Sequence, residues 1–202
     1  MTTLDFNDYQ RRADITSSLH KTESITHRLT MAGMGLACEA GEYGMEVNHV
    51  IEKALNDPFE LRGFTDWRDL IKELGDIMWY VAEAATSLGI HLDDLAAKHL
   101  IVGRKGELNR QPDRWLEWSL RTHTMVGHCG FFGDYIKKVA FHDHPLDKAK
   151  AIELLSFAFQ QVREMVLRLD IDMVEVLAAN LIKLEKRYGK AFTAEASLNR
   201  TA

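Results

Sequence analysis

The sequence predicts an all-α protein, a helical bundle, and three observations support that fold class. Apolar residues recur every three to four positions along most of the chain, which is the period of an amphipathic helix. The 202 residues include only three prolines but many Ala, Leu, Glu and Lys, which favour helices. No convincing strand pattern is present.

The predicted helices follow one another with short connections. They are expected at residues 5–17, 27–55, 67–88, 92–103, 115–142, 147–169 and 172–188. Between the second and third we expect a loop at 57–66, with Asp66 as the cap of the next helix. Residues 104–114, RKGELNRQPDR, are expected to form a polar connector, and the tail after Phe192 is expected to fray.

Composition restricts the classes of protein that the chain can represent. The formal net charge of −5 argues against duplex nucleic acid as a partner, because phosphate binding needs a basic face. No run of 18 apolar residues is present, so no membrane span is expected. The first residues lack the apolar core of an export signal, and two cysteines are too few for a disulfide framework. We therefore expect a cytoplasmic protein.

The chain contains an internal similarity, which predicts one domain over 1–202 built from two diverged repeats, at about 27–103 and 119–190. Four residues match four others at an offset of 92: Gly35, Gly41, Tyr43 and Val47 with Gly127, Gly133, Tyr135 and Val139. A second set matches at an offset of 81: Ile71, Leu74, Val81 and Glu83 with Ile152, Leu155, Val162 and Glu164.

The two repeats differ in their chemistry. Four acids of the first repeat, Glu39, Glu42, Glu73 and Asp76, align with Phe131, Asp134, Leu154 and Phe157. Four polar residues of the second, Asn180, Lys183, Arg187 and Tyr188, align with His99, Val102, Gly106 and Glu107. We therefore expect one composite site in a pseudo-dimer, whose complement comes from the far end of the same chain or from a partner chain.

The four acids have the spacing of a metal site. Glu39 and Glu42 are three residues apart and so share one helix face, and Glu73 and Asp76 repeat that spacing on the next helix. Their flanks are apolar, so ionised carboxylates there would repel one another and burial would raise their pKa values. A hard dication resolves this, and Mg²⁺ typically bridges carboxylates to substrate phosphates. The sequence therefore predicts a Mg²⁺ site for a polyphosphate.

Smaller signals surround these acids. Gly41 and Gly75 lie inside the two motifs, where glycine is expected to let helices approach closely. Trp79 or Tyr80 is a candidate for stacking on a nucleobase, although core packing is an equal alternative. The segment 5–30, with Phe6, Tyr9 and His27, is a candidate to close over the base. No Walker-type phosphate loop is present.

Three segments together resemble the MazG family of all-α nucleoside triphosphate pyrophosphohydrolases. Gly35–Glu42 (GLACEAGE) resembles the family's GLxxExGE helix, Glu73–Tyr80 (ELGDIMWY) its ELGDxxWY helix, and Asn180–Tyr188 (NLIKLEKRY) its NxxKLxxRY helix. The resemblance covers about 10–90 and 172–192. A fused pair of repeats in one chain is also similar to the related dimeric all-α dUTPases.

The resemblance implies a function and a set of roles. Glu39, Glu42, Glu73 and Asp76 would be catalytic Mg²⁺ ligands, with Mn²⁺ as a substitute. Asn180, Lys183, Arg187 and Tyr188 would contact substrate or support the site. The reaction would convert a (d)NTP and water to (d)NMP and pyrophosphate, in a monomeric pseudo-dimer or a homodimer.

Alternative functions remain open. They are a dUTP-specific diphosphatase, a phosphoribosyl-ATP pyrophosphatase, which nothing in the sequence favours, and a non-catalytic bundle that binds Mg²⁺ and nucleotide as a sensor or scaffold. Other candidate residues have simple interpretations: Glu46 as an outer acid beside the site, Lys53 as a solvated lysine, and His142, Asp143 and His144 as a solvated turn.

Overall fold

The computed structural model describes residues 4–19, 24–56, 68–108, 115–189 and 192–198, and within these ranges it contains helices and no strand. The all-α prediction is therefore confirmed. The helices are α1 (Phe6–Ile15), α2 (Ile25–Asn56), α3 (Arg68–Leu88), α4 (Leu92–Ala97), α5 (Trp115–Phe141), α6 (Lys148–Arg168), α7 (Met173–Tyr188) and α8 (Ala194–Leu198).

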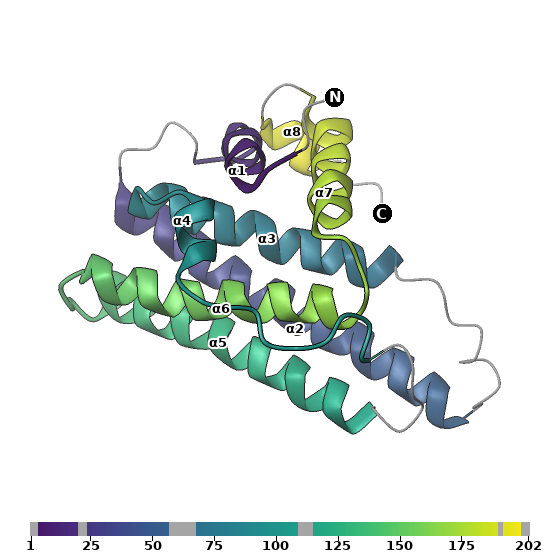
Figure 1. Ribbon diagram of the computed structural model, residues 1–202. Helices are drawn as coiled ribbons and strands as arrows, with labels where there is room; N and C mark the ends of the chain where they lie inside the picture. Colours follow the sequence, from purple (N-terminus) through teal and green to yellow (C-terminus); the bar gives the residue numbers. More distant parts are fainter. Residues whose placement is uncertain (1–3, 20–23, 57–67, 109–114, 190–191, 199–202) are drawn as a thin grey trace.

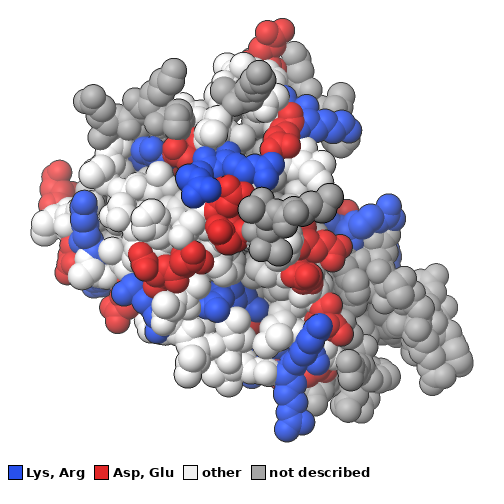
Figure 2. Space-filling view, turned by 45° about the horizontal axis from the view of Figure 1, so that its top comes forward, with Lys and Arg blue, Asp and Glu red and all other residues white. Residues whose placement is uncertain are grey.

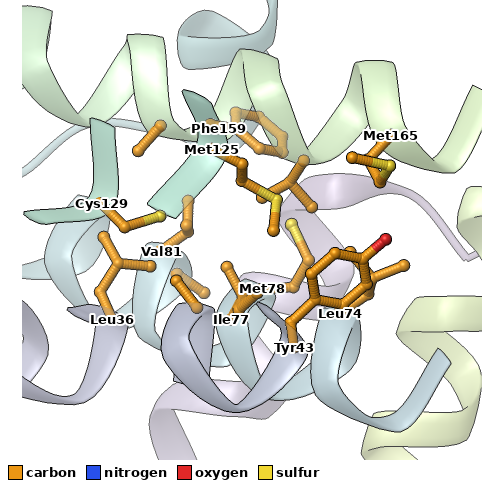
Figure 3. Packing of buried hydrophobic residues seen from close by; sticks show 14 of the residues in the cluster. Leu36, Tyr43, Leu74, Ile77, Met78, Val81, Met125, Cys129, Phe159 and Met165 are labelled. Carbon is orange, nitrogen blue, oxygen red and sulfur yellow. The ribbon is translucent and has the colours of Figure 1, made fainter. Parts of the chain in front are cut away.

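Four long helices form the body of the bundle. α2 packs against both α3 and α5, while α6 packs against α3 and α5 (Figure 1). Apolar side chains from all four helices point toward one another in the centre (Figure 3). Those labelled in the figure are Leu36, Tyr43, Leu74, Ile77, Met78, Val81, Met125, Cys129, Phe159 and Met165. Such a stripe on each helix is what the apolar period predicted.

The shorter helices pack on this body in a crossed order, so that α4 and α7 lie mainly on long helices that are not their neighbours in the sequence. α7 packs on α3, although three helices lie between them in the sequence, and α4 packs on α6. α1 also packs on α3 and α7, so α1, α7 and α8 lie together along one side of α3 (Figure 1). This arrangement brings α1 and α7, which are far apart in the sequence, to the helix that carries Glu73 and Asp76.

Ion pairs and caps fix these short helices in place. Arg28 of α2 contacts Asp14 of α1 at 2.6 Å and Glu83 of α3 at 2.7 Å, and thereby joins three helices. The Asp172 side chain accepts a hydrogen bond from the Val174 backbone N–H at the start of α7. At the other end of α7, Gly189 has a φ of 63°, a conformation that glycine adopts without strain.

Two predicted elements differ from the structure. The helix expected over 92–103 ends at Ala97. Beyond it, long side chains from α6 satisfy the backbone instead: Arg168 donates to the Val102 carbonyl, and Glu164 accepts from the Val102 N–H. The tail that was expected to fray contains α8. The predicted loop at 57–66 and the Asp66 cap lie outside the described residues.

Among the described helices, none combines the length and the apolar character that a membrane crossing requires.

Candidate functional site

Three of the four predicted acids form a compact group between α2 and α3. One carboxylate oxygen from each of Glu39, Glu42 and Glu73 lies within 4.8 Å of the other two. The spacing of three residues brings Glu39 and Glu42 to the same side of α2, where the neighbouring α3 presents Glu73. Among the described residues, no other group of three or more Asp, Glu, His or Cys has ligand atoms close enough together to share a metal ion.

The fourth acid, Asp76, lies beside this group and is bound by α7. Asn180 Nδ2 donates to Asp76 Oδ1 at 2.9 Å, and Lys183 Nζ contacts the same oxygen. Asp76 is nevertheless close enough to Glu39 for its charge to raise the Glu39 pKa. The far end of the chain therefore reaches the acidic site directly.

Gly35 and Gly75 lie where neighbouring helices pack closely, whereas Gly41 does not. A Cβ on Gly75 would lie 2.9 Å from Asn180 Cβ, so a side chain there would push α7 off α3. A Cβ on Gly35 would overlap the ring of Tyr80. The prediction for Gly41 is wrong, because a Cβ there would meet nothing within 4 Å. Close packing therefore depends on Gly35 and Gly75.

Burial and mutual repulsion shift the ionisation of the acids. The pKa of Glu39 rises to about 7, first through burial and then through the charges of Asp76, Glu42 and Glu73. Burial also raises the pKa of Glu73, and the neighbouring Lys72, 3.0 Å away, partly offsets this. The Glu39 and Glu73 carboxylates are therefore more easily protonated than free ones, as expected for buried acids that are crowded together.

The donor set fits a hard divalent cation. All of the close ligand atoms are carboxylate oxygens, which Mg²⁺ and Mn²⁺ prefer. The buried Glu73 Oε2 has no hydrogen-bond partner among the described residues, and buried carboxylate oxygens are normally paired. A cation between the three glutamates would satisfy that oxygen and remove the repulsion.

A pocket of about 360 Å³ opens beside the acids. Its lining combines Glu39, Glu42 and Asp76 with the cations Lys72, Lys183 and Arg187 and the aromatic residues Trp79, Tyr80, Tyr188 and Phe192. On the face that turns α1, α7 and α8 toward the viewer, acidic and basic side chains lie intermixed (Figure 2). Charges of both signs beside aromatic rings suit a metal-bound polyphosphate carrying a base.

The residues predicted to contact substrate divide into two groups. Lys183, Arg187 and Tyr188 line the pocket. Asn180 is only 3% exposed and is not part of the lining, but it donates a hydrogen bond to Asp76. Asn180 therefore supports the site rather than touching a ligand.

The N-terminal segment reaches the pocket through different residues from those expected. Tyr9 is fully buried and Phe6 packs against Phe159, so neither is placed to close over a base. Thr16 lines the pocket instead and accepts a hydrogen bond from Trp79 Nε1 at 2.9 Å. Neither Thr16 nor Lys72 was predicted to line the pocket. The position of Lys72 directly before Glu73 could have indicated that it lies at the site.

The remaining candidates lie away from the site. Lys53, His142, Asp143 and His144 are exposed, as their simple interpretations predicted. Glu46 is half-buried one turn beyond Glu42 and does not line the pocket.

Comparisons with known proteins give one partial relative. No family model matches the chain, and no solved structure matches it. The Gene 37 protein of Mycobacterium phage L5 is 36% identical over 72 residues, which are 36% of this chain. The match spans 60% of the length of that curated relative, whose name states no activity.

Proposed function

We propose that this chain is a Mg²⁺-dependent nucleoside triphosphate pyrophosphohydrolase, which converts a (d)NTP and water to (d)NMP and pyrophosphate. The observation that carries the proposal is the group of three carboxylate oxygens, from Glu39, Glu42 and Glu73, within 4.8 Å of one another at a mixed-charge pocket. The resemblance of three segments to MazG motifs also supports it.

The pocket offers a division of roles among its residues. Glu39, Glu42, Glu73 and Asp76 would hold Mg²⁺, which when bound would neutralise charge on the phosphate chain. Lys183 and Arg187 are four residues apart on one face of α7, so both can reach phosphate oxygens from the same side. Trp79, Tyr80 or Tyr188 offers an aromatic face for the base.

Water activation needs a carboxylate that can accept a proton near neutral pH. Glu39 can take this role, because it lines the pocket beside Glu42 and Asp76. Its position beside Glu42 and Glu73 would place it next to the phosphates that the cation holds.

We further propose that the chain consists of two fused, diverged repeats with a single composite site. Residue pairs related by the offset of 81 make corresponding contacts. Asp76 bonds to Asn180, and at the equivalent positions Phe157 stacks on His99 with ring centroids 4.6 Å apart. Gly75 abuts Asn180, and Ser156 hydrogen-bonds to His99 at 2.9 Å.

The crossed packing supports the same idea. α7 lies on α3 and α4 lies on α6, as expected if the third helix of each repeat packs on the second helix of the other. The acids of the first repeat thus meet the polar helix of the second within one chain.

The test is turnover by the protein and by variants of its acids. We expect Glu42→Gln and Asp76→Asn to abolish hydrolysis of (d)NTPs while circular dichroism shows an unchanged fold. Normal activity in either variant would refute the ligand assignment. Turnover confined to dUTP would indicate a dUTP diphosphatase, and nucleotide binding without turnover would indicate a sensor or scaffold.

A further inference from the structure

A chain of hydrogen bonds links the N-terminal helix to the acidic site. The Tyr9 hydroxyl donates to Asn180 Oδ1 at 2.9 Å, and Asn180 Nδ2 donates to Asp76 Oδ1 at 2.9 Å. The three residues come from α1, α7 and α3. Tyr9 is 0% exposed, so it cannot touch a ligand in the pocket and can act only through its neighbours.

The direction of these bonds fixes the orientation of the Asn180 side chain. An amide has a donor end and an acceptor end, and only the donor end suits a carboxylate. The Tyr9 hydroxyl occupies the acceptor end, and burial together with the Asp76 charge raises the Tyr9 pKa, so the hydroxyl keeps its proton. The Asn180 NH₂ group is thereby directed to Asp76.

Packing transmits this orientation to the acid. Asn180 lies against Gly75, so closely that a Cβ on Gly75 would be 2.9 Å from Asn180 Cβ. Asn180 and Lys183 both contact Asp76 Oδ1. Among the described contacts, Asp76 Oδ2 is therefore the oxygen left for a ligand.

We propose that Tyr9 is a positioning residue of the metal site, which orients the Asn180 amide so that Asp76 presents its second oxygen to the cation. This inference rests on the proposed function, because it assumes that Asp76 is a ligand. It assigns the N-terminal helix a role in the site that needs no contact with substrate. Residues that hydrogen-bond to a metal ligand without touching the metal commonly lower the metal affinity when they are removed.

The experiment measures metal binding without turnover. Mn²⁺ is titrated into the full-length protein, and free Mn²⁺ is followed by electron paramagnetic resonance. Tyr9→Phe removes only the hydroxyl, and we expect it to weaken Mn²⁺ binding by about tenfold while the melting temperature stays within a few degrees. The matched control is Tyr43→Phe, which also removes a fully buried hydroxyl, one that accepts a bond from Trp118 Nε1. We expect it to leave Mn²⁺ affinity unchanged.

A double-mutant cycle separates positioning from a general structural effect. If Tyr9 acts through Asn180, Tyr9→Phe should have no further effect on Mn²⁺ affinity in an Asn180→Ala background. An equal loss in both backgrounds would overturn the inference. If the wild type binds Mn²⁺ and Tyr9→Phe binds it with the same affinity, the inference is overturned but the metal site is not. Absence of Mn²⁺ binding to the wild type would overturn both.

Discussion

Glu39 combines a raised pKa with a place in the acidic group. Its pKa of about 7 lies above the ordinary value near 4.5, first because of burial and then because of neighbouring acids. Between these two values the folded protein holds a proton that the unfolded chain has released. Stability therefore falls as pH rises through this window.

This linkage predicts a difference between the wild type and Glu39→Gln. In EDTA, the melting temperature of the wild type should fall from pH 5 to pH 8. The melting temperature of Glu39→Gln should fall by less over the same range. Adding Mg²⁺ at pH 8 should stabilise the wild type more than the variant, because the cation relieves a repulsion that the variant lacks. Identical pH profiles for the two proteins would contradict the crowding of Glu39 with the other acids.

Residue patterns predicted the acids better than their supports. The spacings indicated that Glu39 and Glu42 share one helix face and that Glu73 and Asp76 share another, and the structure brings Glu39, Glu42 and Glu73 together. The link from Tyr9 to Asn180 had no signal in the sequence, because the residues are 171 positions apart and meet only through the packing of α1 on α7. Such contacts depend on tertiary structure.

Among the elements, the long helices and α1 lie close to their predicted ranges, whereas α4 and α8 do not. α2, α3, α5, α6 and α7 follow the apolar period, and their bounds lie close to the predicted ranges. α4 ends at Ala97, and beyond it Arg168 and Glu164, distant in sequence, bind the backbone at Val102. Local periodicity carries no information about bonds of that kind.

The contact between α3 and α7 gives a prediction at the scale of elements. Gly75→Ala should reduce the free energy of unfolding by about 1–3 kcal/mol, because the new methyl group overpacks against Asn180. The matched control is Gly41→Ala, where a Cβ meets open space and replacement of a helical glycine should stabilise by up to about 1 kcal/mol. Urea unfolding measures both, and equal effects would contradict the described α3–α7 contact.

At the scale of the whole molecule, the proposed repeats predict one nucleotide site per chain. Where the first repeat has Glu39, Glu73 and Asp76, the second has Phe131, Leu154 and Phe157, and Phe157 is occupied by stacking on His99 and His128. Isothermal titration with Mg²⁺ and a non-hydrolysable dNTP analogue should give one ligand per chain. Two equivalent sites per chain would contradict a composite site.

Product analysis tests the central proposal most directly. The purified protein is incubated with Mg²⁺ and each of the common NTPs and dNTPs, and the products are separated by anion-exchange chromatography. We predict monophosphate and pyrophosphate in equal amounts from at least one nucleotide, and no reaction in EDTA. Absence of both products across the whole panel would contradict the assignment of this site as a nucleotide pyrophosphohydrolase.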